Sequence, residues 1–183
     1  MIDEVTLVSQ LQNNNSKELA FRNLVSQYKE RLYWHIRKIV LSHDDADDVL
    51  QNTFIKVFKS IDAFKGESKL YSWMYRIATN EAITFLNKKA KTQNVDITDY
   101  QMELAKNLAD DDWFSGNEIQ RILQEAIATL PQKQQLVFNM KYFDEMKYED
   151  MSHILDTSVG SLKASYHHAV KKIEEYIKNF SED

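Results

Sequence analysis

The scarcity of glycine and proline is the feature that most limits what this chain can fold into. Its 183 residues include only three Gly and one Pro. Long helices tolerate such scarcity, whereas β-hairpins and phosphate-cradling loops need these residues at their turns. With Gly only at positions 66, 116 and 160, neither a G-x-G-x-x-G motif nor a P-loop can be written. The chain is therefore predicted to be all-α.

Composition narrows the class of protein further. A hydrophobic content of 43% supports folded cores rather than disorder. Cysteine is absent, which excludes disulfides, cysteine zinc sites and thiol catalysis. The first residues, MIDEVTLVSQ, lack the basic and apolar regions of a signal peptide, and no apolar run reaches membrane-spanning length. We expect a soluble, cytoplasmic protein without membrane insertion.

Residues 64–91 organise the rest of the chain. Read as a helix from about Leu70, they bury one stripe of apolar side chains and present a second face that is polar and aromatic. The second face contains Trp73, Arg76, Asn80, Thr84 and Asn87. A ring for stacking, donors for base edges and cations for phosphate suit a single nucleic-acid strand. An amphipathic helix with an ordinary solvated face has the same spacing.

Charge supports the nucleic-acid interpretation of this region. Residues 56–91 carry eight Lys or Arg against three acidic residues, within a chain of net charge −5. A basic island in an acidic protein favours a local contact with phosphate. In the loop before the helix, Gly66 permits a tight turn, and Ser68 is expected to cap the helix.

The preceding segment predicts two further helices. Residues 19–40 carry a long apolar stripe, with His35 expected at a surface or boundary position. Ser42 or Asp44 can cap the next helix. An exposed Phe54 among carboxylates and amides would mark a docking surface, although a well-capped core helix is equally consistent.

The acidic run also suggests a different class of protein. Asp44, Asp45 and Asp48 spell D-D-x-x-D, a magnesium–diphosphate motif of helical prenyl-transfer enzymes. Those enzymes need a second acidic motif facing the first, and no helical stretch here supplies a comparable cluster. No metal or cofactor is therefore expected.

An acidic linker and a helix-turn-helix complete the chain. Residues 92–118 are acidic and poorly periodic, which predicts a flexible linker with a short helix near residues 100–108 and an anchor at Trp113 and Phe114. Residues 148–155 form a short helix, and after a polar turn Ser158 can cap a longer one. The longer helix presents Ser, Lys and His outward, as duplex DNA binding requires. Adjacent His167 and His168 diverge too much for a metal site.

Three stretches occur in one order: DADDVLQNTFIKVFK, FKGESKLYSWMYRIATNEAITFLNKKAK and LPQKQQLVFNMKYFDEMKYEDMSHILDTSVGSLKASYHHAVKKI. Together they resemble the extracytoplasmic-function, or group 4, sigma factors of bacterial RNA polymerase. The resemblance implies a non-enzymatic promoter-recognition subunit that contacts the clamp helices of the largest polymerase subunit, the flap of the second, promoter DNA and an anti-sigma factor.

The resemblance also assigns residues to three contacts. Docking on polymerase would use Asp45, Asp47, Asp48, Gln51, Asn52 and Phe54. A melted minus-ten strand would meet Phe64, Lys65, Ser68, Trp73, Arg76, Asn80, Lys88 and Lys89. A duplex minus-thirty-five element would meet Ser158, Ser161, Lys163, Ser165, His167, His168, Lys171 and Lys172. Many relatives carry Arg at the positions of Ser165 and His168.

These assignments divide the chain into three parts. Residues 1–91 form the domain for polymerase docking and the minus-ten element, residues 92–117 the acidic linker, and residues 118–183 the helix-turn-helix domain. Two alternatives are a regulator that binds duplex DNA alone and a magnesium-dependent helical enzyme. The net charge predicts weak DNA binding by the isolated chain, because phosphate neutralisation dominates non-specific affinity.

Overall fold

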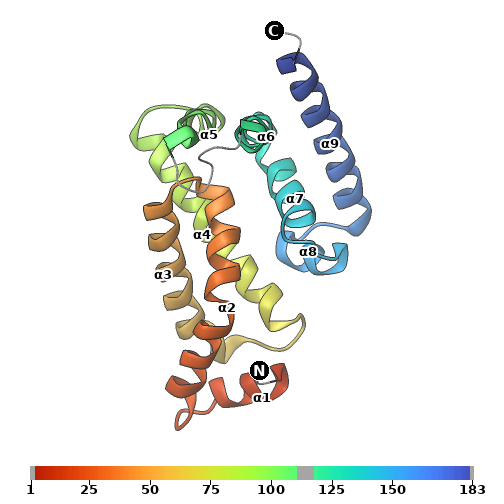
Figure 1. Cartoon of the computed structure of the whole chain (residues 1–183). Helices are drawn as coiled ribbons and strands as arrows, with labels where there is room; N and C mark the ends of the chain where they lie inside the picture. Colours follow the sequence, from red (N-terminus) through yellow and green to blue (C-terminus); the bar gives the residue numbers. More distant parts are fainter. Residues whose placement is uncertain (1–2, 111–117, 182–183) are drawn as a thin grey trace.

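The computed structural model describes residues 3–110 and 118–181, and over these ranges every regular element is helical. The all-α prediction is thereby confirmed. The N-terminal half contains α1 (Glu4–Leu11), α2 (Lys17–Val40), α3 (His43–Ser60), the short 3₁₀ helix η1 (Ile61–Ala63) and α4 (Leu70–Thr92). Helices α2, α3 and α4 pack side by side, and α1 lies across the end of α2 (Figure 1).

The C-terminal half contains α6 (Glu118–Ala128), α7 (Gln132–Tyr142), α8 (Tyr148–Leu155) and α9 (Val159–Ser181). Helix α9 packs along α6, α7 and α8. The short helix predicted before the polar turn matches α8. Asp156 ends α8 in the left-handed conformation (φ 50°), and the Ser158 hydroxyl accepts the Ser161 amide at 3.3 Å, which confirms the predicted cap of α9.

The predicted linker is not structureless where it is described. It contains α5 (Ile97–Lys106) and η2 (Asn107–Asp110), so the expected short helix begins a few residues earlier than predicted. Helix α5 packs against both α4 and α6, and its Tyr100, Gln101 and Ala105 are buried. The proposed anchors Trp113 and Phe114 lie outside the described residues.

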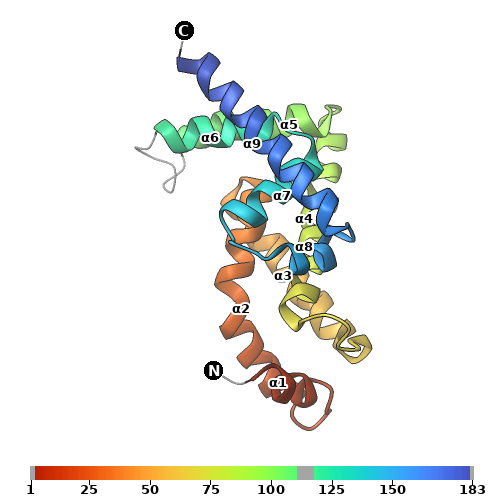
Figure 2. The same cartoon turned by 90° about the vertical axis from the view of Figure 1, so that its right-hand side faces the viewer.

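One hydrophobic core runs through both halves. Met74, Ala78 and Leu86 of α4 belong to the same cluster of buried side chains as Met151 of α8 and Leu162 of α9. A second cluster lies between α6, α7 and α9. Figure 2 shows α8 lying close to α4, and α7 contacts α2. The two sequence-defined domains therefore share an apolar contact in addition to the chain that joins them.

Two local predictions were wrong. Ser68 does not cap α4: Lys69 is the N-cap residue, and the carboxylate of Glu4 in α1 accepts the Leu70 amide at 2.9 Å. His35 is not at the surface, because its side chain is only 1% exposed. Both differences arise from partners far away in the sequence, which local patterns cannot reveal. No helix in the described ranges is long and apolar enough to cross a bilayer.

Candidate nucleic-acid interface

A pocket of about 330 Å³ lies between the loop of residues 63–68 and the first turns of α4. Its walls include five of the residues predicted to contact the minus-ten strand: Phe64, Lys65, Ser68, Trp73 and Arg76. Arg76 is exposed, Trp73 is half-buried and Phe64 is buried. The structure thus brings together an aromatic ring, a guanidinium and a lysine, as stacking and phosphate contacts require.

Long-range contacts hold the loop of this pocket in place. The side-chain amide of Gln12 donates to the carbonyls of Ile61 and Phe64, at 3.2 and 2.9 Å. Gly66 adopts a positive φ of 73°, which confirms the predicted tight turn. The Phe64 ring packs against Trp73 with 5.2 Å between ring centroids. Phe64 therefore packs against the indole and also lines the pocket.

The remaining minus-ten residues extend along α4. Asn80 is exposed one turn beyond Arg76. Lys88 and Lys89 lie farther on, about 22 to 24 Å from Trp73 along the helix axis at a rise of 1.5 Å per residue. Lys88 is exposed, but Lys89 forms an ion pair with Asp45 at 3.3 Å. The two lysines are thus separate from the pocket.

The residues predicted to dock on polymerase lie along α3. Asp47, Asp48, Gln51 and Asn52 are exposed, and the Ser42 hydroxyl caps the helix as predicted. Asp45 is half-buried beside Lys89. Of the two alternatives for Phe54, the structure shows the core position: this ring is buried and packs edge-on against Phe21 with centroids 6.2 Å apart.

Phe54 instead forms part of a groove of about 540 Å³ between α2 and α3. The apolar side chains of this groove are Phe21, Val25, Phe54, Ile55 and Phe58. Ile55 is 45% exposed. Leu19, two residues before Phe21 on α2, is 65% exposed. Sequence reasoning missed both residues. Their apolar character on otherwise polar helix faces was the available signal.

The predicted minus-thirty-five residues lie on the accessible side of α9. Seven of them are exposed: Ser158, Ser161, Lys163, His167, His168, Lys171 and Lys172. Ser165 is half-buried, which places it at the margin of this surface. The Lys163 ammonium lies 5.7 Å from the centre of the Tyr148 ring, so α8 helps to position it. The second helix of a helix-turn-helix presents such a surface to a major groove.

Electrostatics near the pocket are set by Asp150 on α8. The Lys69 ammonium lies 3.0 and 3.2 Å from its two carboxylate oxygens. Burial opposes the charged carboxylate, but hydrogen bonds from Tyr71 and Lys69 outweigh it and lower the pKa of Asp150. Burial, with the Asp150 hydrogen bond, raises the pKa of Tyr71 to about 12. Tyr71 therefore remains a hydrogen-bond donor at neutral pH.

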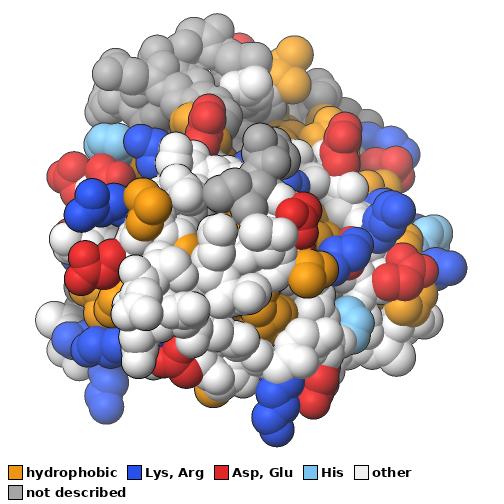
Figure 3. Space-filling view, turned by 90° about the horizontal axis from the view of Figure 1, so that it is seen from below, with side chains coloured by type: hydrophobic (Ala, Val, Ile, Leu, Met, Phe, Trp, Pro, Cys, Tyr) orange, Lys and Arg blue, Asp and Glu red, His pale blue; other side chains and the backbone are white. Residues whose placement is uncertain are grey.

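Charge is mixed elsewhere on the molecule. On the face shown in Figure 3, acidic and basic side chains of the described residues are interspersed. Among the residues with described positions, no three His, Asp or Glu side chains gather as metal ligands. In place of such a cluster, Asp45 of the D-D-x-x-D motif pairs with Lys89.

Comparison with known proteins defines the class of this helical, two-part architecture. Residues 24–92 match the family model for sigma-70 region 2, and residues 120–173 match that for sigma-70 region 4. The chain is thus built from two regions of a sigma-70-type transcription initiation factor.

Curated relatives narrow the family. The chain is 31% identical to the ECF RNA polymerase sigma-E factor of Haemophilus influenzae over 97% of its length and 96% of the relative's. It is 28% identical to the ECF sigma factor SigW of Bacillus subtilis, covering 87% and 90% of the two chains. The chain belongs to the extracytoplasmic-function, group 4, sigma factors of RNA polymerase.

Solved structures share the fold. CnrH, solved in complex with the cytosolic domain of CnrY, has a TM-score of 0.71 at 19% identity, covering 96% of this chain and 97% of that one. The sigma factor RpoE of Bartonella quintana, solved with the anti-sigma factor NepR, has a TM-score of 0.65 at 20% identity, covering 86% and 96%.

Proposed function

We propose that this promoter-recognising sigma factor binds core RNA polymerase and reads two DNA elements in different physical states. The pocket beside Trp73 takes a base extruded from the melted minus-ten strand, and α9 reads the minus-thirty-five element as duplex. The observation that carries the proposal is the convergence of Phe64, Lys65, Ser68, Trp73 and Arg76 on one pocket within the region 2 match.

The chemistry of the pocket suits an extruded base. The half-buried Trp73 offers a plane for stacking, and its position against Phe64 fixes that plane before the base arrives. Arg76 and Lys65 are exposed and can meet phosphates or base edges. Asn80 extends the same face with an amide that can both donate and accept. Lys88 at the far end of α4 can follow the strand.

The α3 surface supports the polymerase contact. Its exposed carboxylates and amides border the apolar groove between α2 and α3. A partner helix with basic and apolar side chains, such as a clamp helix of the largest polymerase subunit, complements both features. Phe54 then contributes to the floor of the groove, while Ile55 and Gln51 contribute at its edge.

The proposal extends to two further partners. The linker carries net negative charge and would thread toward the polymerase active-site cleft, while the C-terminal domain contacts the flap of the second-largest subunit. An anti-sigma factor is proposed because the two similar structures were each solved with a bound partner. In the RpoE structure that partner is the anti-sigma factor NepR.

The direct test is transcription with purified core polymerase on fragmented genomic DNA of the source organism, with and without this chain. RNA 5′-ends are mapped by sequencing. We expect new start sites that share two upstream elements and that weaken when Trp73 or Lys171 is replaced by Ala. Identical start sites with and without the chain contradict the proposal. If the isolated chain bound a palindromic DNA duplex tightly in a gel shift, the result would instead support a regulator that acts without polymerase.

A further inference from the structure

Most of the described lining of the base pocket comes from a loop outside any helix. Trp73 and Arg76 of α4 and His153 of α8 form part of the lining. The rest lies in residues 63–68: Ala63, Phe64, Lys65, Glu67 and Ser68. The side chains on α4 start from a regular helix, whereas residues 64–69 belong to none. The conformation of the loop therefore sets the shape of the pocket.

The loop makes few hydrogen bonds of its own. The Phe64 amide donates to the Ile61 carbonyl at 3.1 Å, and the Ser68 hydroxyl lies 3.4 Å from the carbonyl oxygen of Lys69. At Gly66, in the middle of the loop, an added Cβ would meet no atom within 4 Å, so close packing does not fix the turn there. A segment with so few internal contacts keeps one conformation only when other parts of the structure hold it.

The start of the loop is held by the end of α1 and the start of α2. Gln12, the C-cap residue of α1, donates from its side-chain amide to the carbonyl oxygens of both Ile61 and Phe64. Lys17, the first residue of α2, forms an ion pair with Asp62 at 2.7 Å. Three polar contacts from one short stretch of chain thus fix the backbone where it leaves α3 and enters the pocket.

The end of the loop is held by the same helix. The carboxylate of Glu4 accepts the amide of Leu70, the first residue of α4, at 2.9 Å. Apolar burial fixes α1 itself, because Leu7 and Leu11 are buried in the core cluster that contains Ile61 and Leu70. Helix α1 therefore holds both ends of the connection from α3 to α4, beside which it lies in Figure 1.

These contacts start from residues outside the part of the chain that matches sigma-70 region 2. The match begins at residue 24, whereas Glu4, Gln12 and Lys17 precede it. The pocket loop and α4 lie inside the match. A segment that is not part of region 2 thus determines the geometry of the region 2 pocket.

We infer that residues 4–17 are a positioning element for the base pocket, in which Gln12 fixes the loop and thereby determines which minus-ten base is accepted. The inference rests on the proposed function, because it concerns the base taken by the same pocket. Gln12 is a positioning residue, since it contacts the loop backbone. Discrimination between bases needs polar groups held within about 0.5 Å of their working positions. A loop released at its start loses that accuracy and accepts other bases.

Initiation from a promoter library tests this role. Holoenzyme transcribes a mapped promoter whose minus-ten positions are randomised, and a transcribed barcode identifies each template, so sequencing gives a relative rate for every base. Gln12→Met removes both donated hydrogen bonds at nearly the same side-chain length. The preference for the favoured base over the next should fall about fivefold, in line with the net contribution of one hydrogen bond. An unchanged preference overturns the inference.

Two matched variants separate positioning from a general effect on folding. Gln10→Met makes the same change two residues earlier in α1, where the side chain bonds to none of the described loop residues, and should keep the preference. Gln12→Lys retains donors that reach both carbonyl oxygens and should also keep it. If Gln12→Met lowers initiation from every template by the same factor, or Gln12→Lys loses the preference as Gln12→Met does, the positioning role is overturned.

A second contact keeps the test decisive if circular dichroism shows that Gln12→Met has lost helix. Lys17→Gln then releases the same end of the loop at Asp62 and must shift the preference in the same direction. Its shift is smaller, because Asp62 is 61% exposed and such ion pairs are weak. Chain-directed transcription with an unaltered base preference overturns the positioning role and leaves the proposed function intact. Absence of chain-directed transcription, with the unchanged chain included, overturns the proposed function itself.

Discussion

At the scale of single residues, Trp73 is the side chain whose environment says most about the pocket. Its ring is half-buried against Phe64, so one face is held by the protein and part of the indole remains accessible. A preorganised ring loses little conformational freedom when a base stacks on it. The neighbouring Arg76 is exposed and adds a cation on the same wall.

Replacing Trp73 with Ala should weaken promoter opening by the holoenzyme by about 1–3 kcal/mol, the usual contribution of one base–aromatic stack. The measurement is permanganate reactivity of unpaired thymines at a mapped promoter. Trp73→Phe is the matched control, because it keeps a ring against Phe64 and should retain most of the opening. Equal losses in both variants would show that packing, rather than stacking on DNA, is what the indole provides.

At the scale of helices, sequence patterns predicted α4, α8 and α9 because each has local apolar periodicity and a recognisable start. The same patterns could not identify contacts between distant segments. His35 bonds to Asp144, 109 positions away, and the amide of Leu70 bonds to Glu4, 66 positions away. The pattern left the exposure of Phe54 undecided for the same reason, because the burial of this ring depends on Phe21 in α2. Periodicity identifies a face, but the partner helix decides whether that face is covered.

The start of α4 offers a test of one such distant contact. Glu4→Ala removes the carboxylate that accepts the Leu70 amide, and the loss of a helix cap costs about 1 kcal/mol. We expect a lower urea midpoint and faster hydrogen exchange at the Leu70 amide. Glu4→Gln keeps an acceptor oxygen and should behave nearly as the unchanged chain. If Glu4→Ala leaves exchange at Leu70 unchanged, α1 does not cap α4 in solution.

The exposed lysines of α9 predict how the affinity for duplex DNA depends on salt concentration. Each phosphate contact to a lysine contributes about 0.9 to the slope of log affinity against log salt on duplex DNA. Lys171→Ala should therefore reduce this slope by about one for holoenzyme bound to a mapped promoter duplex. Lys178→Ala, on the same helix beyond the predicted contacts, should not change it. A slope that falls equally in both variants would assign the effect to general charge.

At the scale of the whole molecule, two helical domains carry the two proposed DNA surfaces and share one continuous core. Linking two weak sites raises their combined affinity when both can engage at once. In the structure the C-terminal half packs against the N-terminal half, with His153 of α8 among the residues that line the pocket beside Trp73. If α3 and the α2–α3 groove dock on polymerase, α8 and α9 remain available to contact duplex DNA.

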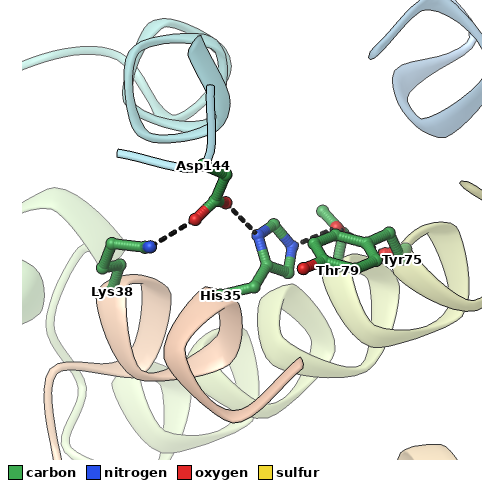
Figure 4. A network of polar contacts seen from close by, with 5 residues as sticks. All are labelled: His35, Lys38, Tyr75, Thr79 and Asp144. Carbon is green, nitrogen blue, oxygen red and sulfur yellow. Dashed lines mark hydrogen bonds and ion pairs between the residues drawn. The ribbon is translucent and has the colours of Figure 1, made fainter. Parts of the chain in front are cut away.

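The buried contact of Asp144 with His35 and Lys38 (Figure 4) also predicts how the packing of the two halves responds to acid. Asp144 is faced by His35 and Lys38 from α2 and by Tyr75 from α4, with Arg31 of α2 interacting with Tyr75. Burial alone would raise the pKa of Asp144, but the hydrogen bonds and charges of His35 and Lys38 outweigh it and lower that pKa. A carboxyl with a lowered pKa stabilises the packed arrangement of the two halves fully above its ordinary pKa of about 3.9. That stabilisation is lost as the pH falls through the lowered value.

Spin labels at Lys29→Cys on α2 and Lys178→Cys on α9, both exposed positions in a sequence without cysteine, report the distance between the two halves. The distribution of this distance should stay narrow from neutral pH down to about pH 4 and broaden below it, where Asp144 and Asp150 take up protons. Both carboxyls have lowered pKa values, so both contribute in the same direction. The Asp144→Asn/Asp150→Asn variant should show no such acid step, since it has no carboxyl to protonate at either contact. Far-UV circular dichroism over the same range separates domain opening from unfolding, because opening alone preserves the helices. Broadening that begins near neutral pH, or an identical acid step in the variant, would show that other groups hold the domains together.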